Sequence, residues 1–240
     1  MPLPKIATPT YELVLPSNNK TVKYRPFLVK EEKILIMALE SEDTKQITNA
    51  IKTVIGNCIL SRGIKVEKLA TFDIEYLFLN VRAKSVGETV EVNVTCPDDG
   101  ETQVPVEIDI DSIKVRKNPD HSNVIKLDDN LSVQMQYPSL TQFIESNFDI
   151  DAEKNQVDES LNVIMSCIKQ VYNEEEAWDA TECTKKELKD FVEQMNSKQF
   201  KDVESFFDTM PKLSHTLKVI NPKTKVENEV VIEGLASFFN

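Results

Sequence analysis

The sequence predicts an α+β protein: a small mixed domain with paired hairpins built from both chain ends, plus an inserted acidic helical segment. Two observations predict this class. Short segments of alternating apolar and polar residues, separated by turn residues, occur near both ends of the chain, as in antiparallel hairpins. Most of the negative charge lies between them, together with a long helical stripe. We therefore expect residues 1–117 and 211–240 to form one discontinuous mixed α/β domain, and residues 118–210 to form a mainly helical acidic insert.

The charge distribution separates the insert from the two ends. The chain of 240 residues carries 28 basic and 40 acidic side chains, a net charge of −12. Residues 118–210 alone carry 8 basic and 20 acidic side chains, whereas residues 1–117 carry 16 and 17, and residues 211–240 carry 4 and 3. Such a surface repels phosphate backbones, so a nucleic-acid partner is not expected. The acidity fits either a solvated helical surface or a surface that steers the protein to a basic partner.

Composition sets the broad class. Hydrophobic residues make up 40% and charged residues 28%, which is typical of globular proteins. No apolar run approaches the roughly 20 residues of a membrane helix, and the N-terminus lacks the apolar core of a signal peptide. We expect the chain to stay in a cytoplasm or to reach its site by assembly. The four cysteines contain no C-x-x-C pair, and disulfides are not expected.

The N-terminal region reads as a hairpin followed by three helices. Residues 11–15 and 21–25 alternate around a turn-like segment that begins at Pro16. Helix formers fill residues 30–40, and apolar residues recur at helical spacing between Ile47 and Ile59. A third helix is predicted from Thr71, a plausible N-cap, to Gly87.

The middle of the chain predicts two further hairpins and several helices. Residues 88–95 and 102–110 flank one turn, with Pro105 placing the second strand at an edge or a bulge. Residues 122–127 and 131–137 form the next pair. Apolar residues at helical spacing then predict helices. These residues are Leu140, Phe143 and Ile144, followed by the stripe of Val157, Leu161, Ile164, Met165, Ile168 and Val171.

The last third predicts two capped helices and a final hairpin. Thr184 and Glu187 form a capping-box pattern, and Ser197 is the predicted cap of the next helix. Pro211 marks the exit from that helix, and strands are expected near 215–220 and 226–232.

Two turns at opposite ends of the chain echo each other. Cys96-Pro-Asp-Asp99-Gly100 and Asn221-Pro-Lys-Thr224-Lys225 each join two strands, in the shape of a zinc knuckle. Four thiolates in such a pair would bind Zn²⁺ tetrahedrally. The four ligand positions here would be Cys96, Asp99, Asn221 and Thr224, and only one of them is a thiolate. We therefore expect no metal site, and either two ordinary hairpins or two hairpins that pack together.

Catalytic motifs are absent from the sequence. It contains no glycine-rich phosphate loop and no G-x-S-x-G elbow, and its two histidines, His121 and His215, have no partner at metal spacing. Asp98 and Asp99 should raise the pKa of Cys96, which disfavours a nucleophile there. Glu174–Glu176 are expected at a solvated helix end. We expect a protein that is not an enzyme, with no catalytic residues and no cofactor. The alternative is a metal-dependent enzyme or regulator that uses Cys96 and nearby carboxylates.

Several segments together resemble a known family. These are residues 24–32, which begin Tyr-Arg-Pro-Phe, residues 200–213, the Asn221-Pro222 pair, and residues 233–239. The chain resembles the baseplate hub subunit family of T-even-like contractile-tailed bacteriophages, many of whose members have a C-x-x-C-G knuckle where this chain has Asn221 and Thr224. The resemblance implies a structural or assembly role in the tail baseplate hub without catalysis. The implied partners are other baseplate or hub proteins, in the host cytoplasm during assembly or in the virion tail, with no membrane. It leaves open a homo-oligomer and the choice between a virion component and an assembly factor.

The C-terminus suggests a partner-binding site. Leu235, Phe238 and Phe239 fall at i, i+3 and i+4 after Gly234 and would share one face of a helical turn. Terminal residues fray unless something holds them. The two readings of these residues are packing on the protein's own core and binding to a partner.

Overall fold

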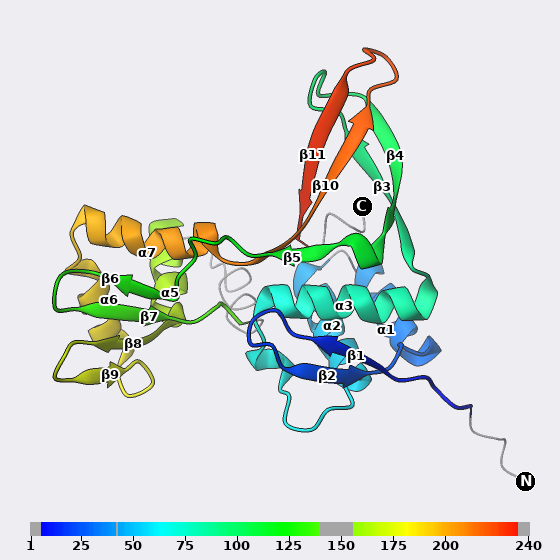
Figure 1. The fold of residues 1–240 in the computed structure, drawn as a ribbon. Helices are drawn as coiled ribbons and strands as arrows, with labels where there is room; N and C mark the ends of the chain where they lie inside the picture. Colours follow the sequence, from blue (N-terminus) through cyan, green and yellow to red (C-terminus); the bar gives the residue numbers. More distant parts are fainter. Residues whose placement is uncertain (1–5, 42, 140–155, 235–240) are drawn as a thin grey trace, which may run out of the picture. The chain divides into compact units, whose positions relative to one another are not determined.

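The fold is seen in a computed structural model, which describes residues 6–41, 43–139 and 156–234. The chain divides into two compact units. Unit 1 comprises Met1–Arg116 and Lys212–Asn240, and unit 2 comprises Lys117–Pro211. Each unit contains helices and small antiparallel sheets, so the predicted α+β class is confirmed (Figure 1). Within the described ranges no helix is long and apolar enough to cross a membrane.

The first part of unit 1 is a hairpin followed by three helices, as the periodicity predicts. Strands β1 and β2 pair antiparallel with Tyr11 opposite Tyr24, on either side of the turn predicted to begin at Pro16. Helix α3 is buried on several sides, with Leu77, Leu79 and Val81 fully shielded from solvent. The elements are β1 (Tyr11–Val14), β2 (Thr21–Tyr24), α1 (Val29–Glu40), α2 (Thr44–Cys58), the 3-10 turn η1 (Val66–Lys68) and α3 (Thr71–Val86).

A shielded ion pair fixes the start of α1. The Glu31 carboxylate is fully buried and accepts a hydrogen bond from Arg25 Nη2 at 3.1 Å. It also accepts one from the backbone N–H of Leu28 at 2.9 Å, and so satisfies a donor that the helix itself leaves unpaired. Removing one partner of such a pair would leave a buried charge, which makes the pair a positional constraint on α1.

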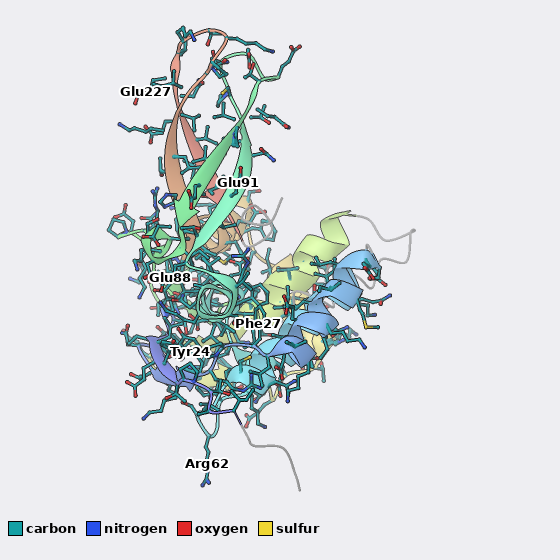
Figure 2. The ribbon with its side chains drawn as sticks, turned by 90° about the vertical axis from the view of Figure 1, so that its right-hand side faces the viewer. Tyr24, Phe27, Arg62, Glu88, Glu91 and Glu227 are labelled. Carbon is teal, nitrogen blue, oxygen red and sulfur yellow. The ribbon has the colours of Figure 1, made fainter. Side chains whose placement is uncertain are left out.

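The rest of unit 1 is built from two hairpins distant in sequence. Strands β3 (Thr89–Thr95) and β4 (Gln103–Asp109) form one, and β10 (Lys212–Ile220) and β11 (Glu227–Glu233) form the other. After the 3-10 turn η2 (Ile110–Ser112), β5 (Lys114–Arg116) adds to the second, giving the order β11-β10-β5. The two hairpins project side by side from the helices in both views, with Glu91 and Glu227 marking them in Figure 2.

Alternation along these strands sends apolar side chains to one face. Val90, Val92 and Val94 of β3 are buried, as are Leu217 and Val219 of β10. Pro105 lies on β4 opposite Asn93, in a two-stranded sheet where every strand is an edge, as its missing N–H predicted.

Unit 2 packs one face of a sheet against helices. The strand order is β6-β7-β8-β9, and the covered face carries Ile125, Val133 and Val171. Phe206 and Val203 of α7 and Val192 of α6 complete this core. The elements are β6 (Val124–Lys126), β7 (Ser132–Met135), α5 (Gln156–Cys167), β8 (Ile168–Tyr172), β9 (Ala177–Asp179), α6 (Lys185–Glu193) and α7 (Ser197–Thr209).

Two predictions for this segment are wrong. Helix α5 ends at Cys167, so Ile168 and Val171 do not continue the helical stripe but lie on β8 and pair with β7. The Cys167 carbonyl accepts a hydrogen bond from the Gln136 N–H at 2.8 Å, which turns the chain into the sheet. Glu174–Glu176 therefore lie in the β8–β9 connection and not on a helix.

The starts of α3, α6 and α7 lie within one residue of their predicted positions. The Thr184–Glu187 capping box is confirmed, and Gly87 is the C-cap of α3. Ala70 and Asn196, not Thr71 and Ser197, occupy the N-cap positions of α3 and α7. The Asn196 side chain accepts from the next two free backbone donors, a role in which asparagine equals serine. The helix expected around Leu140, Phe143 and Ile144 lies outside the described residues.

Candidate functional site

The two echoing turns share two backbone features. In the β3–β4 turn the Gly100 N–H donates to the Cys96 carbonyl at 2.9 Å, and in the β10–β11 turn the Lys225 N–H donates to the Asn221 carbonyl at 2.9 Å. Gly100 and Lys225 also share a left-handed backbone, with φ of 69° and 65°. The turns differ in length by one residue, because the Cys96 N–H donates to the Thr102 carbonyl whereas the Asn221 N–H donates to the Val226 carbonyl.

The tips of the two hairpins are joined by side-chain hydrogen bonds. Asn221 Nδ2 donates to Asp98 Oδ1 at 2.9 Å, and Thr224 Oγ1 donates to Asp98 Oδ2. In the other direction, the Asp98 N–H donates to Asn228 Oδ1 at 3.1 Å. We call Asp98, Asn221, Thr224 and Asn228 the tip cluster. It connects residues more than a hundred positions apart, and so ties the two chain ends together within unit 1.

The two asparagines of the tip cluster are buried, whereas Asp98 and Thr224 are exposed. Asn221 is fully buried and Asn228 is 7% exposed. Asn221 uses both ends of its amide, because its oxygen accepts from the Lys223 N–H at 2.8 Å while its nitrogen donates to Asp98. Hydrogen bonds from Asn221 and Thr224 hold the pKa of Asp98 below its usual range, so the carboxylate stays ionised at neutral pH.

The residues of the tips do not fit a zinc ion. The four positions expected from the knuckle pattern were Cys96, Asp99, Asn221 and Thr224, but it is Asp98 that reaches the opposite turn. Asp99 instead accepts hydrogen bonds from the Thr102 and Glu101 N–H groups of its own turn, at 3.0 and 3.1 Å. An amide and a hydroxyl are poor zinc ligands. Among the described residues no three His, Cys, Asp or Glu side chains are grouped to hold a metal.

Cys96 is not arranged as a nucleophile. Its side chain is fully buried, and burial together with the charges of Asp98 and Asp99 raises the pKa of the thiol. The thiolate is the reactive form, so this environment lowers reactivity, as the flanking carboxylates predicted. An amide and a hydroxyl in place of zinc-binding thiolates, and a Cys96 thiol with a raised pKa, both disfavour the alternative of a metal-dependent enzyme at this position.

The two histidines are held by structural neighbours. His121 Nδ1 lies 2.9 Å from Thr209 Oγ1 and Nε2 lies 3.1 Å from the Tyr137 hydroxyl, within unit 2. His215 lies on β10, opposite Ile232 in the hairpin of unit 1. The Thr209 hydroxyl donates to the Ser205 carbonyl of its own helix at 2.7 Å, so its proton is directed away from the His121 imidazole.

Sequence reasoning missed an exposed apolar surface on α1. Val29 is 80% exposed, Met37 61%, Leu39 60% and Ile36 49%. Ala38 and Glu31 face inward on the same helix. The signal was present in the run of six apolar residues 34–39, which covers more of a helix than one buried stripe requires.

The predicted C-terminal partner-binding site stays a prediction. Leu235, Phe238 and Phe239 lie outside the described residues, which end at Gly234. The N–H of Gly234 donates to the Leu213 carbonyl at 2.9 Å, and its φ of 72° suits glycine. The described chain thus ends beside β10.

Comparison with known proteins identifies the family. The family model described as T4 bacteriophage base plate protein matches residues 8–240. The chain therefore belongs to this family and is a structural protein of the phage tail baseplate. No curated protein and no solved structure matches the chain.

Proposed function

We propose that the protein is a structural or assembly component of the baseplate hub, which acts by association with other baseplate proteins and without catalysis. The observation that carries this proposal is the exposed apolar face of α1, formed by Val29, Ile36, Met37 and Leu39. Four exposed apolar side chains on one helix favour an interaction surface, and the exposed Lys33 and Glu40 lie among them. The buried Arg25–Glu31 pair fixes this helix at its start, so the face is presented by a rigid element.

A matched pair of variants tests the role of α1. Met37→Asp with Leu39→Asp places two charges on the exposed face, and Leu60→Asp with Val226→Asp places two charges at exposed apolar positions elsewhere in unit 1. We expect both proteins to keep their melting temperature within a few degrees, because all four positions are exposed. Incorporation into baseplate intermediates, measured by sedimentation and immunoblotting, should fall about tenfold or more only for the α1 variant. Equal incorporation of both variants would contradict the proposal.

The C-terminal residues form the second part of the proposal. We infer from the sequence that Leu235, Phe238 and Phe239 bind a baseplate partner, since aromatic anchors commonly dominate interface energies. Phe238→Ala with Phe239→Ala should leave the melting temperature unchanged and reduce complex formation with hub proteins by about tenfold. A fall of many degrees in melting temperature would instead assign these residues to the protein's own core.

Assembly in the host cytoplasm follows from the same proposal. The net charge of −12 repels the phosphate backbone of nucleic acid. The partners in this proposal are therefore other proteins. Fractionation of infected cells should find the protein with hub intermediates before tails are complete. Its recovery only with peripheral baseplate parts would contradict a hub role while leaving the family membership intact.

A further inference from the structure

The sheet of unit 2 has one face covered by helices and one open face. The open face carries two cross-strand rows, which are Val124–Gln134–Gln170–Asp179 and Lys126–Ser132–Tyr172–Ala177. A groove of about 420 Å³ lies on this face, bounded at one end by Glu174–Glu176 of the β8–β9 connection. The helices α5, α6 and α7 pack on the opposite face through Val133 and Val171.

The floor of the groove is polar and its side chains have free hydrogen-bonding capacity. Gln134 and Gln170 are paired in register, and both are half-buried, as is Tyr172. Within the described part of the chain, none of these three side chains makes a hydrogen bond to another residue. Half-buried amides and a phenol without internal partners are what a bound polypeptide could satisfy through its own backbone groups.

The rim of the groove is negatively charged at one end and carries a lysine at the opposite edge. Asn173 Oδ1 accepts from the N–H groups of Glu175 and Glu176 at 2.9 and 2.6 Å, which fixes the turn that carries the three glutamates. These carboxylates form no ion pair with any described residue. Lys126 lies at the other edge, on β6, so a basic group on a ligand is favoured at the β8–β9 end.

We propose that this open face binds an extended segment of a partner protein that places a lysine or arginine against Glu174–Glu176. The segment lies over Gln134 and Gln170, whose amides hydrogen-bond its backbone. The aliphatic stem of its basic side chain packs on the Tyr172 ring, while the charged head group reaches the carboxylates. The surrounding insert, with its 8 basic and 20 acidic side chains over residues 118–210, attracts such a segment at longer range. This binding surface is separate from α1 and does not depend on a hub location.

Titration of the full chain with defined peptides tests the proposal. The probe is a blocked pentapeptide of alternating lysine and valine, and the matched control peptide has glutamate in place of lysine. NMR should show saturable shifts of the Gln134 and Gln170 side-chain amides with the lysine peptide only. The affinity should fall about tenfold as salt rises from about 50 to about 500 mM, because the contact is partly ionic.

Variants separate this groove from general attraction to an acidic protein. Changing Glu174, Glu175 and Glu176 to Gln should weaken binding about tenfold. The matched set of Glu182→Gln, Glu204→Gln and Asp208→Asn removes the same charge from exposed positions of unit 2 outside the groove lining and should change affinity less than about twofold. Equal losses in the two sets, shifts outside the groove, or no saturable shift would overturn the proposal. A dimer that dissociates in Tyr172→Ala would overturn it as well, by assigning the face to a second copy of the chain.

Discussion

Asn221 donates a hydrogen bond to Asp98 at 2.9 Å across 123 positions of sequence. This contact joins the turn of a hairpin near the middle of the chain to the turn of the last hairpin. Since Asn221 is fully buried, its donor has lost water and depends on Asp98. The tip cluster therefore does, with hydrogen bonds, what four metal-bound thiolates do in a pair of zinc knuckles: it holds two turns together.

Removing the carboxylate should destabilise unit 1. Asp98→Ala leaves Asn221 Nδ2 and the Thr224 hydroxyl without their acceptor, and we expect a measurable loss in the free energy of unfolding. Urea unfolding measures this loss, and hydrogen exchange of the β10–β11 amides should accelerate. Glu107→Ala, on the exposed face of the same hairpin opposite Glu91, is the control and should stay within about 0.5 kcal/mol of the parent. Equal stability of the two variants would show that the cluster contributes nothing.

The same contact predicts a pH dependence. The hydrogen bonds from Asn221 and Thr224 lower the pKa of folded Asp98 below its unfolded value of about 3.9. The stabilisation is therefore complete above that unfolded pKa and is lost as the pH falls through the folded pKa. The difference in stability between the parent and Asp98→Ala should stay constant from about pH 8 to pH 5 and shrink below about pH 4. A difference that disappears near neutral pH would require another titrating group.

Lys225 predicts a stabilising substitution. Its φ of 65° is costly for a residue with a Cβ, whereas Gly100 occupies the equivalent position of the other turn without that cost. Lys225→Gly should raise the stability of unit 1 by about 0.5–1 kcal/mol. Lys223→Gly removes the same charge from the same turn at a position without positive φ, and should be neutral or destabilising. A similar effect of both variants would attribute the change to charge and not to backbone strain.

Independent folding of the two units stays a prediction. We expect residues 1–116, joined through a flexible linker to 212–240, to unfold as one cooperative transition. Residues 1–116 alone lack β10 and β11, which would expose Val90, Val92 and Val94 and leave Asp98 without its partners. The shorter fragment should therefore melt at a lower temperature in calorimetry. Equal melting of both fragments would show that the C-terminal hairpin is not part of the first domain.

Much of the fold could be predicted because its signals are local. Turn residues between alternating segments gave the hairpins, and Thr184 with Glu187 marked a helix start. The residue at which α5 ends could not be predicted from such local signals. Ile168 and Val171 fit a helical spacing as well as a strand, and pairing with β7, a long-range contact, decides between them.

The candidate surfaces were harder to predict than the fold. The echo of the two turns indicated that the hairpins meet, but not which aspartate crosses between them. Asp99 accepts a hydrogen bond from Thr102 in its own turn, whereas Asp98 accepts hydrogen bonds from Asn221 and Thr224 of the opposite turn. The groove of unit 2 was missed because Glu174–Glu176 were assigned to a helix. The apolar face of α1 was missed because a run of helix formers does not show which side stays exposed.

The most direct test of the central claim is the amount of this chain in purified baseplate hubs and hub intermediates. Quantitative mass spectrometry against labelled standards gives its copy number relative to the other subunits. An association role in the hub predicts a fixed whole-number ratio in hub intermediates, and loss of that ratio in the Met37→Asp, Leu39→Asp variant. Absence of the chain from these intermediates, or a variable trace amount unaffected by the variant, would contradict the account.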